Sequence, residues 1–334
     1  MNTTPRSVPS KPVAGSRRRE LVILSVKATV SLAIVWFLAT KVDFETLASR
    51  LSAEALVPLT IGIFAGILMM VLTAVRWWGI HFRIRAPIGF PFSIPATMEC
   101  YALNLALPGS VGGDIVRAAR AARVCGRMRE AIMAVLLDRG GNLSAQMVMC
   151  VAVLPFLHIS TASRDLQIAV ILVTAVALVG VAVVYLSPAL LGRSGLKRFR
   201  PVRELVRVGF ILHRILNFPR AVFEIAFMSF VIQAGNVIML WMAILAIGHE
   251  SVLLFTLIVA ASFGMLGSAL PVSFGGLGVR EGAVVWVLLE TGMAEAEAFM
   301  IAIVFGGLVI SQAVPGLFIW AFGRLPPVID LQKS

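Results

Sequence analysis

One twelve-residue pattern, A-L-P-x-S-x-G-G-x-x-V-R, occurs twice in this chain, at residues 106–117 and again at residues 269–280. Eight of the twelve positions are identical without a gap. Four of these identities are Pro, Ser or Gly, which a general excess of apolar residues does not supply. The residue types suit the binding of an anion, so the two copies are the first candidates for a functional site.

Each copy combines a helix stop, a flexible turn and a positively charged side chain. Proline ends a preceding helix, because it has no N–H to donate and restricts the residue before it. Two glycines allow positive φ and close approach of a ligand, and a serine can accept the free N–H groups of the next helix. That helix would present its positive dipole end, and an arginine one turn on would add a fork suited to phosphate. The residues concerned are Ser110, Gly112, Gly113 and Arg117 in the first copy and Ser273, Gly275, Gly276 and Arg280 in the second.

Further polar residues lie near the two copies in sequence. They add to the candidate site Tyr101, Asn104, Asp114, Asp138, Arg139 and Glu281. Asp138, Asn142 and Gln146 recur every four residues and so form one polar stripe on a helix. Ionisable residues within a span usually face a bundle interior or a cavity. Two structural explanations compete with function: close helix packing for the glycines and a charge-paired structural site for Asp138 and Arg139.

The elements that must position these residues are transmembrane helices. The chain is 59% hydrophobic and 14% charged, whereas a soluble domain is nearer about half apolar and about a quarter charged. Six segments are expected to cross a bilayer as helices. They are residues 21–40, 56–75, 131–157, 167–186, 221–247 and 298–321.

Two further segments, residues 88–107 and 251–270, lead into the motifs and are expected to be re-entrant. If 88–107 crossed outright, the arginines after the first motif and the basic loop of residues 187–220 would lie outside, although cytoplasmic loops collect Lys and Arg. Segment 251–270 follows by analogy from the opposite side, but it is also apolar enough to span, which would make the repeats parallel. The hairpins complete two inverted repeats, residues 56–157 and 221–321, an arrangement typical of transporters with a site at the repeat interface.

The expected fold class is therefore an all-α polytopic membrane protein with about six full transmembrane helices and two opposed re-entrant helical hairpins. A single transmembrane domain over residues 21–323 separates a basic tail, residues 1–20, from a tail at residues 324–334. Both tails are predicted to be cytoplasmic, because arginines precede the first span. Segment 21–40 is too long for the apolar core of a signal peptide, and no cleavage pattern follows it.

Other classes of function have less support in the sequence. The three cysteines form no C-x-x-C and pair with no histidine at ligand spacing, so neither a disulfide framework nor a metal site is expected. The net charge of +12 is explained by membrane topology rather than by nucleic-acid binding. The basic clusters at residues 117–129 and 193–220 are predicted to be orientation signals and contacts with anionic lipids.

The motifs resemble those of a known family. N-x-x-L-P-G-x-V-G-G-D-x-x-R at residues 104–117, the later Asp138–Arg139 and P-x-S-x-G-G-L-G-V-R-E-G at residues 271–282 are similar to the flippase-like membrane domain of lysylphosphatidylglycerol synthases. The resemblance covers about residues 21–323. It implies the translocating half alone, without the soluble transferase domain, in the plasma (inner) membrane of a prokaryote. One departure is that residues 304–307 of the second repeat read V-F-G-G where the first repeat has Asp138–Arg139.

The function expected is a membrane lipid translocase, with the headgroup held between two re-entrant helix N-termini. Its substrate would be an anionic, aminoacylated or polyisoprenyl-linked lipid. Two alternatives remain open: an intramembrane transferase on lipid-linked substrates, and an accessory subunit of a lipid or glycan synthase. No catalytic nucleophile, metal or nucleotide motif is found, so no enzyme activity and no cofactor are expected. A homo-oligomer is left open.

Overall fold

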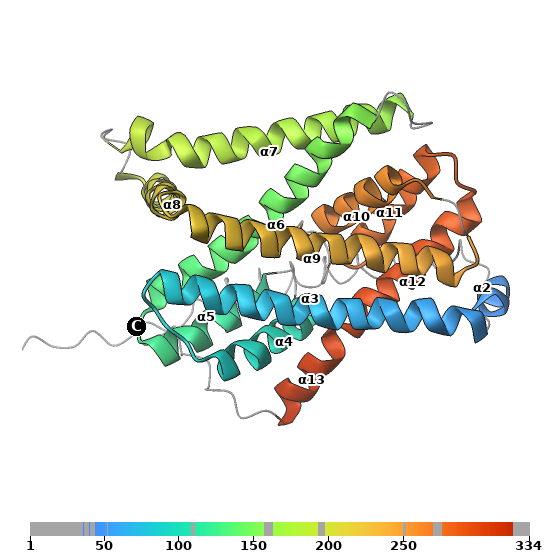
Figure 1. Ribbon diagram of the computed structural model, residues 1–334, viewed down its shortest axis with the longest axis horizontal. Helices are drawn as coiled ribbons and strands as arrows, with labels where there is room; N and C mark the ends of the chain where they lie inside the picture. Colours follow the sequence, from blue (N-terminus) through green and yellow to red (C-terminus); the bar gives the residue numbers. More distant parts are fainter. Residues whose placement is uncertain are drawn as a thin grey trace, which may run out of the picture.

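The computed structural model describes residues 36, 40, 44–51, 53–107, 111–156, 163–192, 198–249, 252–269 and 276–322 (Figure 1). All regular structure in this part of the chain is helical, and no strand occurs in it. The protein is an all-α polytopic membrane protein, which confirms the fold class. The predicted tails, residues 1–20 and 324–334, and nearly all of the predicted first span lie outside the described residues.

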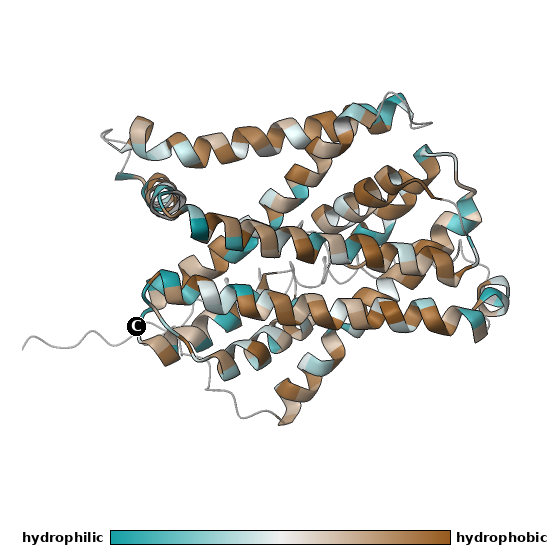
Figure 2. Cartoon of the chain, viewed as in Figure 1, coloured by the Kyte–Doolittle hydropathy of each residue, from teal (hydrophilic) through white to brown (hydrophobic). Residues whose placement is uncertain are grey.

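Four helical stretches are long and apolar enough to cross a membrane. They are Ala53–Arg83 (η1, Ala53–Ala55, with α3, Leu56–Arg83), Arg164–Leu191 (α7), Pro219–Ala246 (α9) and Glu295–Phe322 (α12, Glu295–Ser311, with α13, Ala313–Phe322). Three of them contain a predicted span, and Pro219–Ala246 contains all but the last residue of the span 221–247; hydrophobic residues run along all four in Figure 2. The predicted span 131–157 falls on α6 (Met128–Val153), which has Asp138 and Arg139 near its middle and is followed by η2 (Leu154–Phe156). The total of six spans stays a prediction.

Helices α3 and α9 lie side by side through the middle of the molecule (Figure 1). Their close approach depends on small residues, as in other membrane bundles. A Cβ added to Gly235 of α9 would lie 2.2 Å from Sδ of Met69 on α3, and one added to Gly62 of α3 would lie 2.8 Å from Cδ1 of Leu308 on α12. These contacts hold α3, α9 and α12 together as the scaffold for the remaining helices.

The chain folds into two helical hairpins, one at each motif. The first is α4 (Phe90–Ala106) with α5 (Gly112–Cys125), and the second is α10 (Leu254–Ala269) with α11 (Val279–Glu290). In both, the second helix runs back along the first: the start of α5 packs against the end of α4 at Gly113 and Cys100, and Gly276 before α11 packs against Ser268. The hairpins lie toward opposite ends of α3 and α9 (Figure 1).

Contacts between distant residues define the two ends of the bundle. At one end, here called the arginine-rich end, α3 finishes and α9 begins; its basic residues are Arg83, Arg85, Arg127 and Arg220. There Nη1 of Arg127, after α5, donates to the carbonyl oxygen of Arg85, before α4, at 2.7 Å, so the first hairpin begins and ends at the same place. At the opposite end, Arg50 of α2 (Phe44–Arg50) pairs with Glu297 of α12 at 3.2 Å. This geometry agrees with hairpins that enter from opposite sides, while their re-entrance into a membrane stays a prediction.

The predicted basic loop, residues 187–220, is largely helical instead. Helix α7 continues to Leu191, and α8 (Arg200–Leu216) follows, seen end-on in Figure 1 and therefore lying across α7 and α9. A Cβ added to Gly209 would lie 2.5 Å from Oγ of Ser187, and the ring of His213 stacks on that of Tyr185 at 4.4 Å. In the sequence, the arginines of this segment are spaced three or four residues apart, which is the period of a helix with one polar face.

The last predicted span, residues 298–321, is broken into α12 and α13 at Gln312. Pro315 explains the break, because it has no N–H to donate to the carbonyl of residue 311. The bend directs α13 onto α4, where a Cβ added to Gly316 would lie 1.9 Å from the carbonyl oxygen of Met98. The end of the second repeat thus packs on the hairpin of the first.

Candidate functional site

Four of the predicted site residues meet in one buried group between α5 and α6. Nη2 of Arg117 lies 2.8 Å from Oδ2 of Asp138 and 3.1 Å from Oδ1 of Asp114. Asp114 also accepts, at its Oδ2, a hydrogen bond of 2.6 Å from Nε of Arg139. Together with Arg76 of α3, these residues are called the arginine–aspartate cluster below.

Arg76 is the member that the sequence interpretation missed. The predicted span 56–75 ends one residue before it, but α3 continues two more turns to Arg83 and leaves Arg76 1% exposed. Its Nε donates to Oδ1 of Asp138 at 2.9 Å. Its Nη1 donates to Oδ1 of Asn142 at 2.8 Å and to Oγ of Ser229 at 2.7 Å, which joins α3 to α6 and α9. The sequence signal that the helix continues was the run of largely apolar residues that follows Arg76 and begins with Trp77.

The cluster carries more positive than negative charge, with three arginines against two aspartates. Charges in an apolar interior need partners, because their desolvation is costly. Four of the side chains are almost completely buried, whereas that of Arg139 is 40% exposed. Within the cluster the arginines therefore outnumber the aspartates by one, and the guanidinium of Arg139 lies at its surface.

Arg117 has an unused donor within this group. Its Cζ lies 4.7 Å from the centre of the Trp77 ring, a cation–π contact. Its Nε is buried and lacks a hydrogen-bond partner among the described residues. A buried donor without a partner is costly, so an incoming acceptor at this point would be stabilised.

The tip of the first hairpin is built by close packing and one cap. The N–H of Gly113 donates to Oδ1 of Asn104 at 2.8 Å, so Asn104 caps the start of α5. A Cβ added to Gly113 would lie 2.1 Å from the carbonyl oxygen of Cys100, and one added to Gly112 would lie 2.5 Å from Cβ of Leu107. These glycines serve helix packing. Tyr101, 3.4 Å from Oγ1 of Thr73, faces α3, while Ser110 lies outside the described residues.

The second copy has a smaller charged group. Arg280 and Glu281 form an ion pair, and Oε2 of Glu281 accepts from the N–H of Gly278 at 2.6 Å. On α12, Gly306 faces this pair, since its added Cβ would lie 2.6 Å from Oε1 of Glu281. Helix α12 is the counterpart of α6, which supplies Asp138 and Arg139 in the first repeat, but at this position α12 contributes a glycine and no charge. Gly276 has φ +75°, and Ser273 and Gly275 lie outside the described residues.

The polar stripe of α6 connects the cluster to the second hairpin. Asp138 binds Arg76 and Arg117, and the carbonyl oxygen of Asn142 accepts from Nε2 of Gln233 on α9 at 3.1 Å. Further along, Nε2 of Gln146 donates to the carbonyl oxygen of Ser262 on α10 at 3.3 Å. Eight residues of helix separate Asp138 from Gln146, about 12 Å of rise. The stripe therefore faces the interior between the two hairpins.

Within the described residues, no three His, Cys, Asp or Glu side chains are arranged to hold a metal ion. The chemistry of the cluster is that of guanidinium groups and carboxylates, which suits reversible binding of an anion.

The protein-family model for the lysylphosphatidylglycerol synthase TM region matches residues 23–316 of the chain. This match covers nearly all of the predicted transmembrane domain, residues 21–323, and both motifs. No curated protein matches the chain.

Proposed function

The chain belongs to the family of the lysylphosphatidylglycerol synthase TM region, and from this premise we propose that it moves an anionic or aminoacylated phospholipid between the two leaflets. The family supports a lipid-related function in the membrane. One observation carries the finer proposal: the arginine–aspartate cluster holds an excess positive charge inside the helical bundle, with Arg139 partly exposed. The lipid phosphate would be a further negative partner for these guanidinium groups.

In this mechanism Asp114 and Asp138 act as internal substitutes for the phosphate. Without lipid they pair with the guanidinium groups of Arg117, which is buried, and of Arg139, which is 40% exposed. An arriving phosphate accepts from the exposed Arg139 and from the unused Nε of Arg117, and the aspartates release it again by competing for the same donors. The acyl chains stay in the bilayer throughout. An aminoacylated headgroup would add an ammonium group, for which the aspartates are suitable partners.

The two hairpins form unequal halves of the pathway in this proposal. Re-entrance from opposite sides would bring both hairpin tips toward the middle of the membrane, as in transporters with inverted repeats. The first half carries net positive charge, whereas Arg280 of the second is balanced by Glu281. The headgroup would therefore bind mainly at the first hairpin and pass the second, with the α6 stripe ending at Ser262 as the polar route between them.

Reconstituted vesicles test the proposal. Fluorescent phosphatidylglycerol, lysyl-phosphatidylglycerol and phosphatidylcholine are each followed from the inner to the outer leaflet by chemical quenching. We expect an anionic or aminoacylated lipid to change leaflet faster than in vesicles without protein. Arg117→Gln should slow this movement about tenfold, because it removes charge-assisted hydrogen bonds. Arg123→Gln, exposed on the same helix, is the matched control and should leave the rate unchanged.

Three results would overturn the proposal. If no tested lipid moves faster than in empty vesicles, the protein is not a translocase for these lipids. A covalently altered lipid after incubation would indicate an intramembrane transferase. Movement unaffected by Arg117→Gln would separate transport from the cluster and favour a structural role for it.

A further inference from the structure

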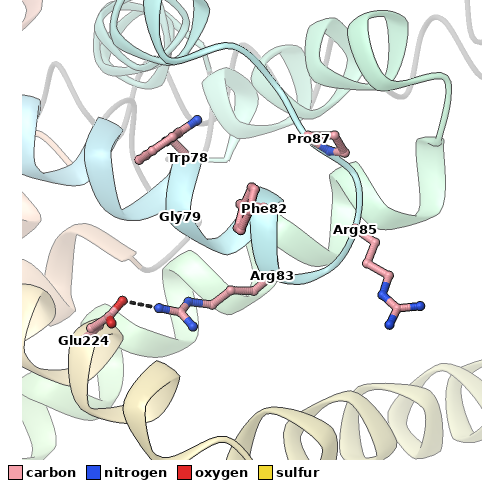
Figure 3. Close-up of a pocket in the computed structure, with 7 residues that line it drawn as sticks. All are labelled: Trp78, Gly79, Phe82, Arg83, Arg85, Pro87 and Glu224. Carbon is pink, nitrogen blue, oxygen red and sulfur yellow. Dashed lines mark hydrogen bonds and ion pairs between the residues drawn. The ribbon is translucent and has the colours of Figure 1, made fainter.

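A surface groove at the arginine-rich end has no role in the proposed pathway. It has a volume of about 690 Å³ and lies where α3 ends beside the start of α9 (Figure 3). Its lining residues are Trp78, Gly79, Phe82, Arg83, Arg85, Pro87 and Glu224. None of them belongs to the arginine–aspartate cluster, so the groove is a separate site.

The groove has a surplus of positive charge. Arg83 points to Glu224 and forms an ion pair with it, drawn as the dashed line in Figure 3. Arg220 also donates to Glu224, from Nε to Oε1 at 3.2 Å. One carboxylate thus serves two guanidinium groups, and Arg85 adds a third. The local charge is two units positive, which complements an anion.

Arg85 is held in an unusual backbone conformation. Its φ of +60° lies in the left-handed region, which residues other than glycine seldom adopt. Two side chains hold the turn. Arg127 donates to the carbonyl oxygen of Arg85 at 2.7 Å, and Nδ1 of His81 lies 2.8 Å from the carbonyl oxygen of Ala86. Among the described residues, the guanidinium of Arg85 has no hydrogen bond or ion pair, and Figure 3 shows it directed away from Glu224. The turn therefore presents an available cation beside the groove.

The remaining wall of the groove is aromatic. Trp78 and Phe82 lie one turn apart on α3 and are 37% and 71% exposed. The Trp78 ring meets that of Phe90, at the start of α4, edge-on at 5.6 Å. Aromatic rings at the end of a membrane-length helix mark the boundary between headgroups and acyl chains. A ligand here would contact the apolar rings with one part and the arginines with another, as a phospholipid does.

We propose that this groove binds an anionic phospholipid, with its phosphate at Arg85 and its glycerol and first acyl carbons against Trp78 and Phe82. The lipid is retained at the surface of the bundle rather than moved through it. Binding here does not require that the protein is a translocase, so the two proposals can fail separately.

Native mass spectrometry of the full-length protein released from nanodiscs tests this inference. The nanodiscs contain equal amounts of phosphatidylglycerol and phosphatidylcholine, and the retained lipids are counted. The wild-type protein should retain phosphatidylglycerol in preference. Arg85→Gln should lower its retention about fivefold, as expected for one arginine near an anionic surface, and Arg83→Gln should lower it less, because Arg83 is already paired with Glu224. Arg50→Gln, at the opposite end of the bundle, is the matched control.

The outcomes separate the possible occupants. Equal retention of the two lipids, or retention unchanged by Arg85→Gln in a protein that still elutes as a single folded species, would overturn the proposal. Excess inorganic phosphate should leave the lipid bound. If inorganic phosphate displaces it completely, the groove is a site for the free anion. If the protein retains phosphatidylglycerol at the groove but moves no lipid between leaflets, only the proposed function is contradicted.

Discussion

Arg76 of α3 and Asp138 of α6 form a buried ion pair, with Nη2 2.8 Å from Oδ1 and side chains 0% and 3% exposed. Asp138 uses its second oxygen for Arg117 of α5. One carboxylate thus links three helices, and the first hairpin is fixed to the scaffold through it. This linkage explains why a candidate binding site is also a stabilising element of the fold.

Asp138→Asn should destabilise the protein strongly. The amide keeps the size of the side chain but leaves Arg76 and Arg117 without their shared negative partner. Removing one member of a buried ion pair costs about 3–5 kcal/mol, so we expect a clearly lowered thermal midpoint in detergent. Asp165→Asn is the control, because Asp165 is exposed in the first turn of α7. An equal midpoint for both variants would show that the cluster does not stabilise the bundle.

Gly113→Ala should separate α4 from α5. The new Cβ would lie 2.1 Å from the carbonyl oxygen of Cys100, which is backbone and cannot turn away. Overpacking of this kind costs about 1–3 kcal/mol. Gly140→Ala on α6 meets no atom within 4 Å and should be neutral. Thermal unfolding of the two variants measures the difference, and a midpoint for Gly113→Ala that equals the wild type would contradict the close hairpin.

Adjacent glycines on α12 give a sharper comparison. Gly306→Ala would place Cβ 2.6 Å from Oε1 of Glu281 and disturb its pair with Arg280, whereas Gly307→Ala meets nothing within 4 Å. We expect translocation and thermal stability to fall only for Gly306→Ala. Identical behaviour of both variants would show that α12 does not lie against the Arg280–Glu281 pair.

Cysteine labelling tests the opposed hairpins and their orientation. In a protein whose native cysteines are replaced, Arg85→Cys and Arg127→Cys should both resist a membrane-impermeant thiol reagent added outside intact cells. Glu295→Cys, at the start of α12, should react with it, because α12 begins at the opposite end of the bundle. Protection of Arg85→Cys with labelling of Arg127→Cys would mean that the first hairpin crosses the membrane. Labelling of both would mean that the protein has the orientation opposite to the predicted one.

The sequence predicted much of the site because the two motifs repeat rare residue types in an apolar background. Asp114 and Arg117, three residues apart on one helix, are neighbours by helical geometry alone, and the four-residue spacing of Asp138, Asn142 and Gln146 placed them on one face. Arg76 was missed because the predicted span ended at residue 75, and α8 was missed because its hydropathy is too low for a span.

Composition and local pattern determined the class of this protein, its helical content and four of the five charged residues of the arginine–aspartate cluster, since hydropathy and helical period are properties of short segments. Only the tertiary structure decided which carboxylate neutralises which arginine. Arg76 and Asp138 are 62 positions apart, and they meet because glycines let helices approach closely enough for buried charges to find partners. The same packing decided that Gly306 faces Arg280 and Glu281, which makes the two repeated motifs chemically unequal.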